Sequence, residues 1–363
     1  MAETIAPLGG RAAWKGSELD WEREALYRLG PAELAEVDGA LAALKRGSPL
    51  DFPDVTPARF PLPTMGKLLA RMKDQLRHGR GFALLRGIDP KRHSLDDLAW
   101  IYAGIGAHLG IAIPQSWQGE LLGHVIDVSD IEVNPRGYHA GGRQNMHTDS
   151  CDVVGLMCIR AAKSGGKSRI ASAVAVHDAL IERRPDLAAR QYRGFRLRRK
   201  EQDAAHGSGM IVSEREIPLW IRGADGLCSY QMAYYARLAA EHGDSTMDAV
   251  GEETLTEVER LASGPEFHLD MSIGEGDIQF LNNRVIVHGR NDFEDWPELS
   301  RRRHLMRLWL MIPDWPRIPA AQVFHTDEDR RLWLRQRQTL MELPSRYFAE
   351  MDSRRAERAS AAE

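Results

Sequence analysis

The sequence predicts a mixed α+β fold in which β-rich sections alternate with helical ones. Short apolar runs broken by Gly, Pro, Asn and Asp occupy residues 111–174, a pattern typical of strands. Amphipathic stretches with helical spacing lie before and after this section. A second group of short apolar runs lies between residues 278 and 311. We therefore expect a sheet-based core with helices packed around it.

Length and composition limit the class of protein. The chain has 363 residues, of which 43% are hydrophobic and 28% charged, and its formal net charge is −4. This composition is globular, and a slightly acidic chain does not favour nucleic acid as a partner. The sequence contains no run of about 18 apolar residues, so no membrane span is expected. A small molecule is the expected substrate or ligand.

The cysteines and the N-terminus indicate a cytoplasmic protein. The three cysteines form no CxxC pair, which is typical of a reduced compartment. The first residues lack a basic region followed by an apolar run, so they do not resemble a signal peptide. We divide the chain into a flexible arm at 1–20, one domain at 21–315, and a peripheral helix with a polar tail at 316–363.

The first half of the chain predicts two helices and a strand. Apolar residues after Thr64 recur at helical spacing as far as Leu76, so a helix is expected there. The glycine-bounded run at 82–87 predicts a buried strand. Ser94 followed by Asp97 resembles a helix cap, and the apolar stretch behind it ends at Gly110.

The rest of the chain predicts a glycine-containing loop, further helices and several strands. Glycines in the 136–146 loop suit either a loop that closes over a pocket or an ordinary connection. A helix is expected over 176–190 with a restart at Pro185, and another over 255–261. The charged run 195–200 predicts a solvated or edge strand, and 201–216 a mobile excursion. Strands are expected at 278–281, 285–288 and 303–311, with a helix from Asp327 onward.

Three residues have the chemistry of a metal site. In an extended strand, residues two apart point to the same side, so His147 and Asp149 should project together. His288, brought in by the fold, would complete a set of two histidines and one carboxylate. Such a set occupies three positions of an octahedral iron and leaves the others open, as oxygenase chemistry requires.

Two arginines of the last predicted strand, residues 303–311, indicate an anionic ligand. Arg303 and Arg307 share one face of this strand with Leu305 and Trp309, while the residues between them face the other side. Both faces have the composition of buried surfaces. A buried guanidinium needs an anionic partner, because an unpaired buried charge costs several kcal/mol. A bound dicarboxylate would provide that partner.

Together these residues identify a family resemblance. The matching motifs are His147 with the segment Gly165 to Ala175, then Asn282, Asn283, Arg284 and His288, then Arg301 to Leu310. They resemble the taurine dioxygenase-like (TauD/TfdA) family of iron(II)- and 2-oxoglutarate-dependent dioxygenases. The resemblance extends over about residues 60–315. It implies a double-stranded β-helix, or jelly-roll, core wrapped by helices.

The resemblance also implies residue roles. His147, Asp149 and His288 would bind iron(II), and Arg303 would bind the distal carboxylate of 2-oxoglutarate with help from Ser168. The implied reaction consumes O2 and 2-oxoglutarate, releases succinate and CO2, and most often hydroxylates a C–H bond of a small acidic or amino-acid-like molecule. Arg307 matches a position that binds an acidic substrate group in some relatives, but it could instead form an internal salt bridge.

The sequence leaves several functional interpretations open. Gln144 and Asn145 lie close to the triad in sequence and are candidates for substrate contact. A zinc hydrolase could use the same three ligands plus water, although it would not need the arginine pair. A noncatalytic small-molecule-binding barrel is the other alternative. The identity of the substrate and the choice between monomer and homo-oligomer are not determined by these patterns.

Overall fold

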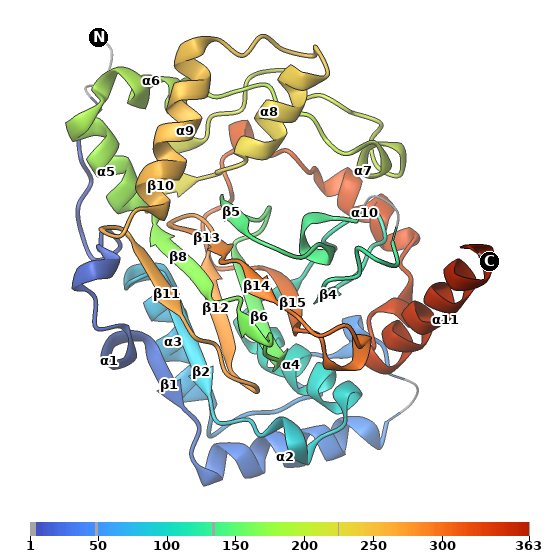
Figure 1. The fold of residues 1–363 in the computed structure, drawn as a ribbon. Coiled ribbons are helices and arrows are strands. Elements are labelled where there is room, and N and C mark those ends of the chain that lie inside the picture. Colours follow the sequence, from blue (N-terminus) through green and yellow to red (C-terminus); the bar gives the residue numbers. More distant parts are fainter. Residues whose placement is uncertain (1–4, 48–49, 133–134, 224, 363) are drawn as a thin grey trace.

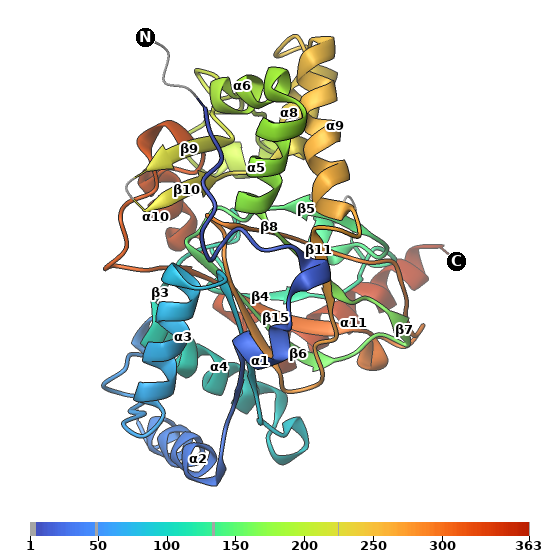
Figure 2. The same cartoon turned by 90° about the vertical axis from the view of Figure 1, so that its left-hand side faces the viewer.

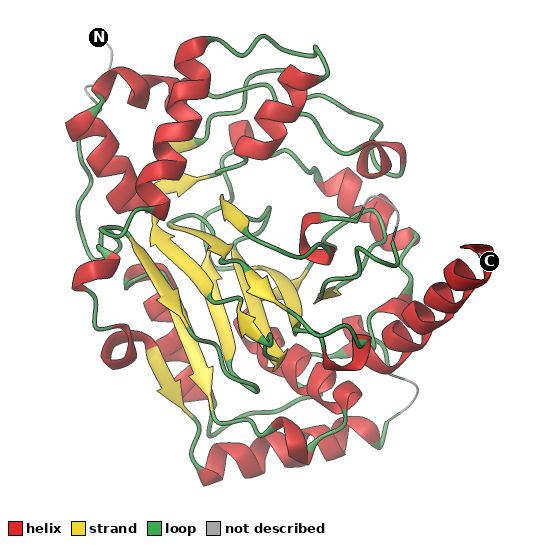
Figure 3. Ribbon diagram, viewed as in Figure 1, coloured by secondary structure: helices red, strands yellow, loops and turns green. Residues whose placement is uncertain are grey.

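Two facing β-sheets form the centre of the molecule, with helices above and below them (Figures 1 and 3). The computed structural model describes residues 5–47, 50–132, 135–223 and 225–362. The larger sheet contains β1 (Leu26–Arg28), β2 (Phe82–Arg86), β3 (Ile111–Ala112), β4 (Leu122–Val125), β6 (Val153–Arg160), β12 (Ile278–Asn282) and β15 (His304–Met311). The smaller sheet contains β5 (Gln144–His147), β8 (Ser168–Ser172), β11 (His268–Met271) and β13 (Ile286–Arg290). Two short ribbons accompany them, β7 (Ser164–Gly165) with β14 (Phe293–Glu294) and β9 (Trp220–Gly223) with β10 (Gly226–Ser229).

The chain repeatedly crosses between the two sheets. Strands β5, β8, β11 and β13 belong to the smaller sheet, whereas β6, β12 and β15 belong to the larger one. All pairings in the two large sheets are antiparallel except that of β1 with β2. This alternation between facing sheets is the jelly-roll arrangement that was expected.

Helices α1 (Trp21–Ala25), α2 (Pro31–Lys45), α3 (Gly66–His78) and α4 (Leu95–Leu109) lie on the side of the larger sheet. Met306, Leu308 and Leu310 of β15 join the core beneath α3 and α4, whereas Leu305 and Trp309 belong to clusters on the opposite face. The strand is therefore buried on both sides, as its composition predicted. Ser94 caps α4 through a bond from the Asp97 amide, and the helix ends before Gly110, also as predicted.

A second helical layer covers the smaller sheet (Figure 2). It contains α5 (Ala173–Arg183), α6 (Pro185–Arg193) and α9 (Ala249–Ser263), with α8 (Ala233–Glu241) beside them. Pro185 begins α6 at its first position, where its missing N–H costs no helical hydrogen bond. The predicted break at this proline is confirmed.

The excursion predicted to be mobile is tied into the structure. It forms α7 (Glu201–Ala205), and its residue Asp203 is buried. Just before it, Arg199 forms a fully buried ion pair of 2.8 Å with Asp329 of α10 (Asp327–Arg335). The strand predicted at 195–200 is reduced to two isolated bridges, from Phe195 to Ile217 and from Arg198 to Val212. Local charge patterns do not reveal such long-range partners, which is why the prediction of a strand over 195–200 was wrong.

The two ends of the chain also contact the body of the protein. Within the segment expected to be a flexible arm, Trp14 is buried and its indole donates to the Arg80 carbonyl at 2.8 Å. At the C-terminal end the structure has two helices, α10 and α11 (Pro344–Ala362), where a single one was expected. Tyr347 and Met351 of α11 are buried. In the described part of the chain, no helix is both long enough and apolar enough to span a bilayer.

Candidate metal and cosubstrate site

The two histidines of the predicted triad lie on neighbouring strands of the smaller sheet. His147 at the end of β5 is directly opposite His288 in β13, and their ring centroids are 4.4 Å apart. The strands approach closely because Gly289 has no side chain: a Cβ there would lie 2.5 Å from the Gln144 carbonyl oxygen. The register of β5 and β13 thus brings the two imidazoles close together.

Asp149 lies near the two imidazoles but outside strand β5. β5 ends at His147, so the expectation that a single strand carries both ligands is wrong. The chain instead turns, and the Asp149 amide donates to the Asn283 side-chain oxygen at 3.0 Å. The Thr148 amide donates to the Gln231 carbonyl at 3.1 Å. The carboxylate is therefore positioned by hydrogen bonds to residues distant in the sequence, and not by the alternation of side chains along a strand.

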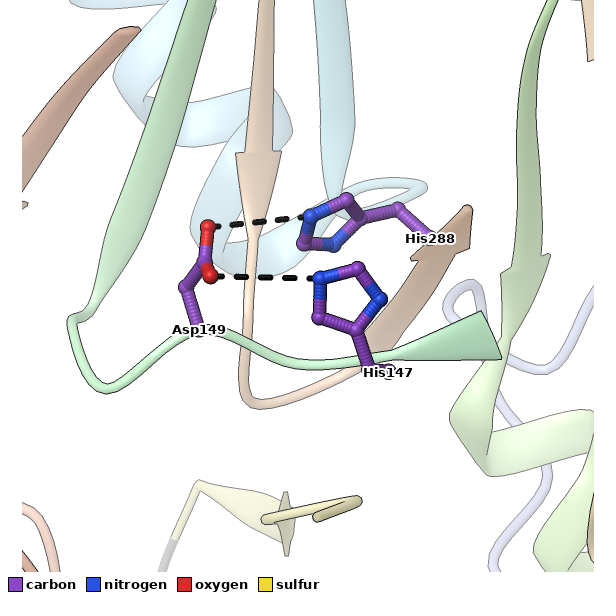
Figure 4. Close-up of side chains that lie close together, drawn as sticks. All are labelled: His147, Asp149 and His288. Carbon is purple, nitrogen blue, oxygen red and sulfur yellow. Dashed lines mark ion pairs between the residues drawn. The ribbon is translucent and has the colours of Figure 1, made fainter. Parts of the chain in front are cut away.

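The three side chains converge on one point (Figure 4). Asp149 Oδ1 lies 4.0 Å from His147 Nε2, and Asp149 Oδ2 lies 3.7 Å from His288 Nε2. One ligand atom from each residue falls within 4.8 Å of the others. Asp149 Oδ2 is buried and has no hydrogen-bond partner among the described residues, as expected of an atom reserved for a cation.

Hydrogen bonds and nearby charges also suit a metal. His147 Nδ1 donates to the Asn145 carbonyl oxygen at 2.8 Å, so its Nε2 is the ring nitrogen that faces Asp149. Burial, followed by the charge of His147, lowers the pKa of His288 to about 3, so its imidazole is neutral. Burial raises the pKa of Asp149, but Arg307 and the two histidines outweigh it and keep the pKa below its usual value. Two imidazole nitrogens and a carboxylate are a ligand set that fits iron(II).

Arg303 lies in a small cavity beside the triad, together with Ser168. It is only 7% exposed, and its guanidinium has no carboxylate partner in the described part of the chain. Burial and the nearby charge of Arg290 lower the pKa of Arg303 to about 10, so it is still a cation at neutral pH. The Ser168 hydroxyl donates to the Gln279 side chain at 2.8 Å and faces the same cavity. An anion would supply the missing partner of Arg303.

A second arginine of this cavity, Arg290, was missed by the sequence analysis. It donates to the carbonyls of Ala140, at 2.9 Å, and Gly142, at 2.9 and 3.1 Å, and so ties the 136–146 loop to β13. Burial lowers its pKa. The sequence could have indicated Arg290, because residues two apart on a strand point to the same side and Arg290 lies two residues after His288.

Arg307 lies between the small cavity and a larger one. Its Nε donates to Gln115 Oε1 at 2.7 Å, and its guanidinium carbon lies 4.4 Å from the Tyr138 ring centroid and 5.1 Å from that of Trp309. Its NH1 is 3.8 Å from Asp149 Oδ1. The internal ion pair considered from the sequence is thus present, and Arg307 also lines both cavities.

The larger cavity has a volume of about 610 Å³ and adjoins His147 and Asp149. Gln144 and Asn145 line it, as predicted for substrate contacts. Trp117 stacks on His206 and does not line the cavity. His325 also lines the cavity. Such a volume suits a small-molecule substrate.

Comparison with known proteins agrees with this geometry. The model of a family described as "Taurine catabolism dioxygenase TauD, TfdA family" matches residues 46–309. FR-33289 synthase from Streptomyces rubellomurinus is 28% identical over 332 residues, which cover 88% of this chain and 94% of the relative. The taurine hydroxylase-like protein SAT17 from Stachybotrys chartarum is 29% identical over 318 residues, covering 83% of this chain and 79% of the relative.

Solved structures show the same fold. Asparagine oxygenase in complex with Fe(II), 3-hydroxyasparagine and succinate superposes with a TM-score of 0.61 at 15% identity, covering 79% of this chain and 93% of that one. The non-haem iron oxygenase OrfP with iron and α-ketoglutaric acid superposes with a TM-score of 0.57 at 17% identity, covering 79% and 94%. The predicted jelly-roll core is confirmed.

Proposed function

The chain belongs to the TauD/TfdA family of iron(II)- and 2-oxoglutarate-dependent dioxygenases, and from this premise we propose which residues bind the metal and which bind the cosubstrate. His147, Asp149 and His288 hold iron(II). Arg303 and Ser168 bind the distal carboxylate of 2-oxoglutarate, and Arg290 lines the same cavity. Membership of this family argues against the zinc hydrolase and the noncatalytic barrel. The observation that carries the assignment is the unpartnered, buried Arg303 beside a converging two-histidine, one-carboxylate triad.

The protein's own contribution is to bind, orient and exclude water. When bound, iron and 2-oxoglutarate supply the oxidising chemistry, in which O2 and 2-oxoglutarate are consumed and succinate and CO2 are released. Arg303 gives the cosubstrate a single orientation through its planar fork of donors. We propose that the 136–146 loop, which Arg290 ties to β13, limits the access of water to the site on one side.

We propose that the main substrate is an amino-acid-like molecule with an acidic group that faces Arg307. Two observations support this proposal: Arg307 lines both cavities beside Asp149, and asparagine oxygenase and OrfP are described in complexes with hydroxylated amino acids. Gln144 and Asn145 line the same cavity and are proposed to contact the substrate. Hydroxylation of a C–H bond is the expected outcome.

Assembly of the site can be tested directly. Anaerobic addition of iron(II) and 2-oxoglutarate to the purified protein should produce a weak visible charge-transfer band, because the cosubstrate then chelates the metal held by the triad. Screening L-amino acids and their N-acyl forms for stimulated succinate release would then identify the substrate class. A protein that shows no band, and that hydrolyses esters or amides with zinc, would contradict this function.

Replacing Arg307 with methionine should weaken turnover of an acidic substrate by about 10- to 100-fold, since a charged hydrogen bond contributes about 1.5–3 kcal/mol. The measurement is kcat/KM for an acidic substrate and for its amide isostere. We expect the variant to lose its preference for the acid, with the iron and 2-oxoglutarate band unchanged. If the acid and the amide are affected equally, Arg307 acts on Asp149 and does not contact the substrate.

A further inference from the structure

A line of positive charge leads away from the metal site along the wall of the larger cavity. Arg307 and Arg136 both lie against the Tyr138 ring, with guanidinium carbons 4.4 and 5.8 Å from its centroid. Lys200, immediately before α7, lines the same cavity next to Arg136. Arg307 lines both cavities, whereas Lys200 lines only the larger one. Lys200 is therefore reached from the larger cavity and not from the small cavity that holds Arg303.

The carboxylates near Lys200 are occupied by other cations. Asp203 accepts two bonds from Arg136, at 2.9 and 3.1 Å, and a third from the Trp117 amide at 3.1 Å. Glu201 is paired with Arg198 at 2.6 Å. Among the residues that the structure describes, the Lys200 ammonium has neither an ion pair nor a hydrogen bond.

No other carboxylate of the cavity is available to Lys200. Glu259 is paired with Arg237 at 3.0 Å. Glu241 of α8 is exposed, and the charges that act on Lys200 are those of Arg136, Asp203 and Glu201. Asp149 belongs to the metal site. The cavity thus has an excess of positive charge on this wall.

A partly buried ammonium without an anionic partner is unfavourable in free energy. Lys200 is half-buried, and burial followed by the charge of Arg136 lowers its pKa. The charged form is disfavoured because it has left water without gaining an anion. A carboxylate, phosphate or sulfonate that entered the cavity would remove this cost, and the flexible lysine stem could follow it.

We propose that Lys200 binds a second acidic group of the main substrate and thereby selects amino-acid-like molecules that carry two acidic groups. One acidic group faces Arg307 beside the metal, and the other faces Lys200 farther along the cavity. This inference rests on the proposed function, because it assigns the substrate of that same site. Lys200 is then a specificity-determining residue that touches the substrate.

Chemical protection tests this contact without relying on turnover. The iron(II)- and 2-oxoglutarate-loaded enzyme, kept anaerobic, is treated with limiting acetic anhydride, and acetylation of Lys200 is measured by peptide mass spectrometry. Lys67, an exposed lysine of α3 outside the cavity, is the reference within the same molecule. The probes are L-glutamate, O-phospho-L-serine and the amide isostere L-glutamine.

We expect L-glutamate or O-phospho-L-serine to reduce the labelling of Lys200 several-fold relative to Lys67, while L-glutamine has little effect. The stronger of the two protectors indicates whether the second group is a carboxylate or a phosphate. Absence of protection by every probe, or equal protection by the acid and its amide, would overturn the proposal.

Substitution gives the second test. Lys200→Met should reduce the preference for a diacidic substrate over its monoamide, measured as the ratio of kcat/KM values, by about tenfold or more. Lys67→Met should leave the ratio unchanged. An unchanged ratio in Lys200→Met with an intact iron and 2-oxoglutarate band would remove Lys200 from this role. Loss of the band in the unmodified enzyme would instead refute the proposed function.

Discussion

Replacing Asp149 with alanine should reduce substrate-dependent succinate formation to background, a loss of at least about 1000-fold, or about 4 kcal/mol of transition-state stabilisation. Asp149 supplies the only carboxylate of the triad, and it lies 3.7 to 4.0 Å from both imidazoles. Without it, two imidazoles alone hold the cation weakly. Succinate should be measured by mass spectrometry, and bound iron after anaerobic dialysis by elemental analysis.

Asp270→Ala is a suitable control for this experiment. Asp270 is a carboxylate of β11 in the same sheet, paired with Arg169 at 2.7 Å, and it lines neither cavity of the site. We expect this variant to keep both iron and activity. Full activity in Asp149→Ala would show that this carboxylate is not an iron ligand.

Arg303→Ala should raise the concentration of 2-oxoglutarate needed for half-maximal activity by about 100-fold or more, because truncation of one partner of a buried charge pair costs about 2–5 kcal/mol. The apparent KM for 2-oxoglutarate is the measurement, and the concentration dependence of the anaerobic band gives an independent one. Arg303→Lys should recover only part of the affinity, since an ammonium lacks the bidentate fork.

Stability measurements separate this loss from misfolding. Without cosubstrate, Arg303 is a buried cation whose pKa is lowered to about 10, so it destabilises the fold at neutral pH. Arg303→Met should therefore unfold at the same temperature as the unmodified protein, or higher, when 2-oxoglutarate is absent. Arg301→Ala, two residues away and exposed, should change neither quantity. An unchanged KM for 2-oxoglutarate in Arg303→Ala would exclude Arg303 as the anchor.

The alternation of side chains along a strand gave a correct prediction for β15, which is buried on both faces. It divided the residues into two opposite sets, of which one lines the cavities and the other packs in the core with α3 and α4. It failed at Asp149, which lies beyond the end of β5, because hydrogen bonds to Asn283 and Gln231 position that residue. Those partners are more than 80 positions away along the chain.

The sequence by itself determined the types of group available for the reaction: two imidazoles, one carboxylate, and arginines at fixed spacing on an apolar strand. It also determined the alternation of strands and helices, because periodicity and caps are local properties. Only the tertiary structure decided that His147 lies opposite His288 and that Arg290 lines the same cavity as Arg303. It also decided that Asp203 pairs with Arg136, while Lys200 has no ion pair within the described ranges. Pairing of charges depends on distances of a few ångströms between segments far apart in sequence, and the packing of the two sheets sets those distances.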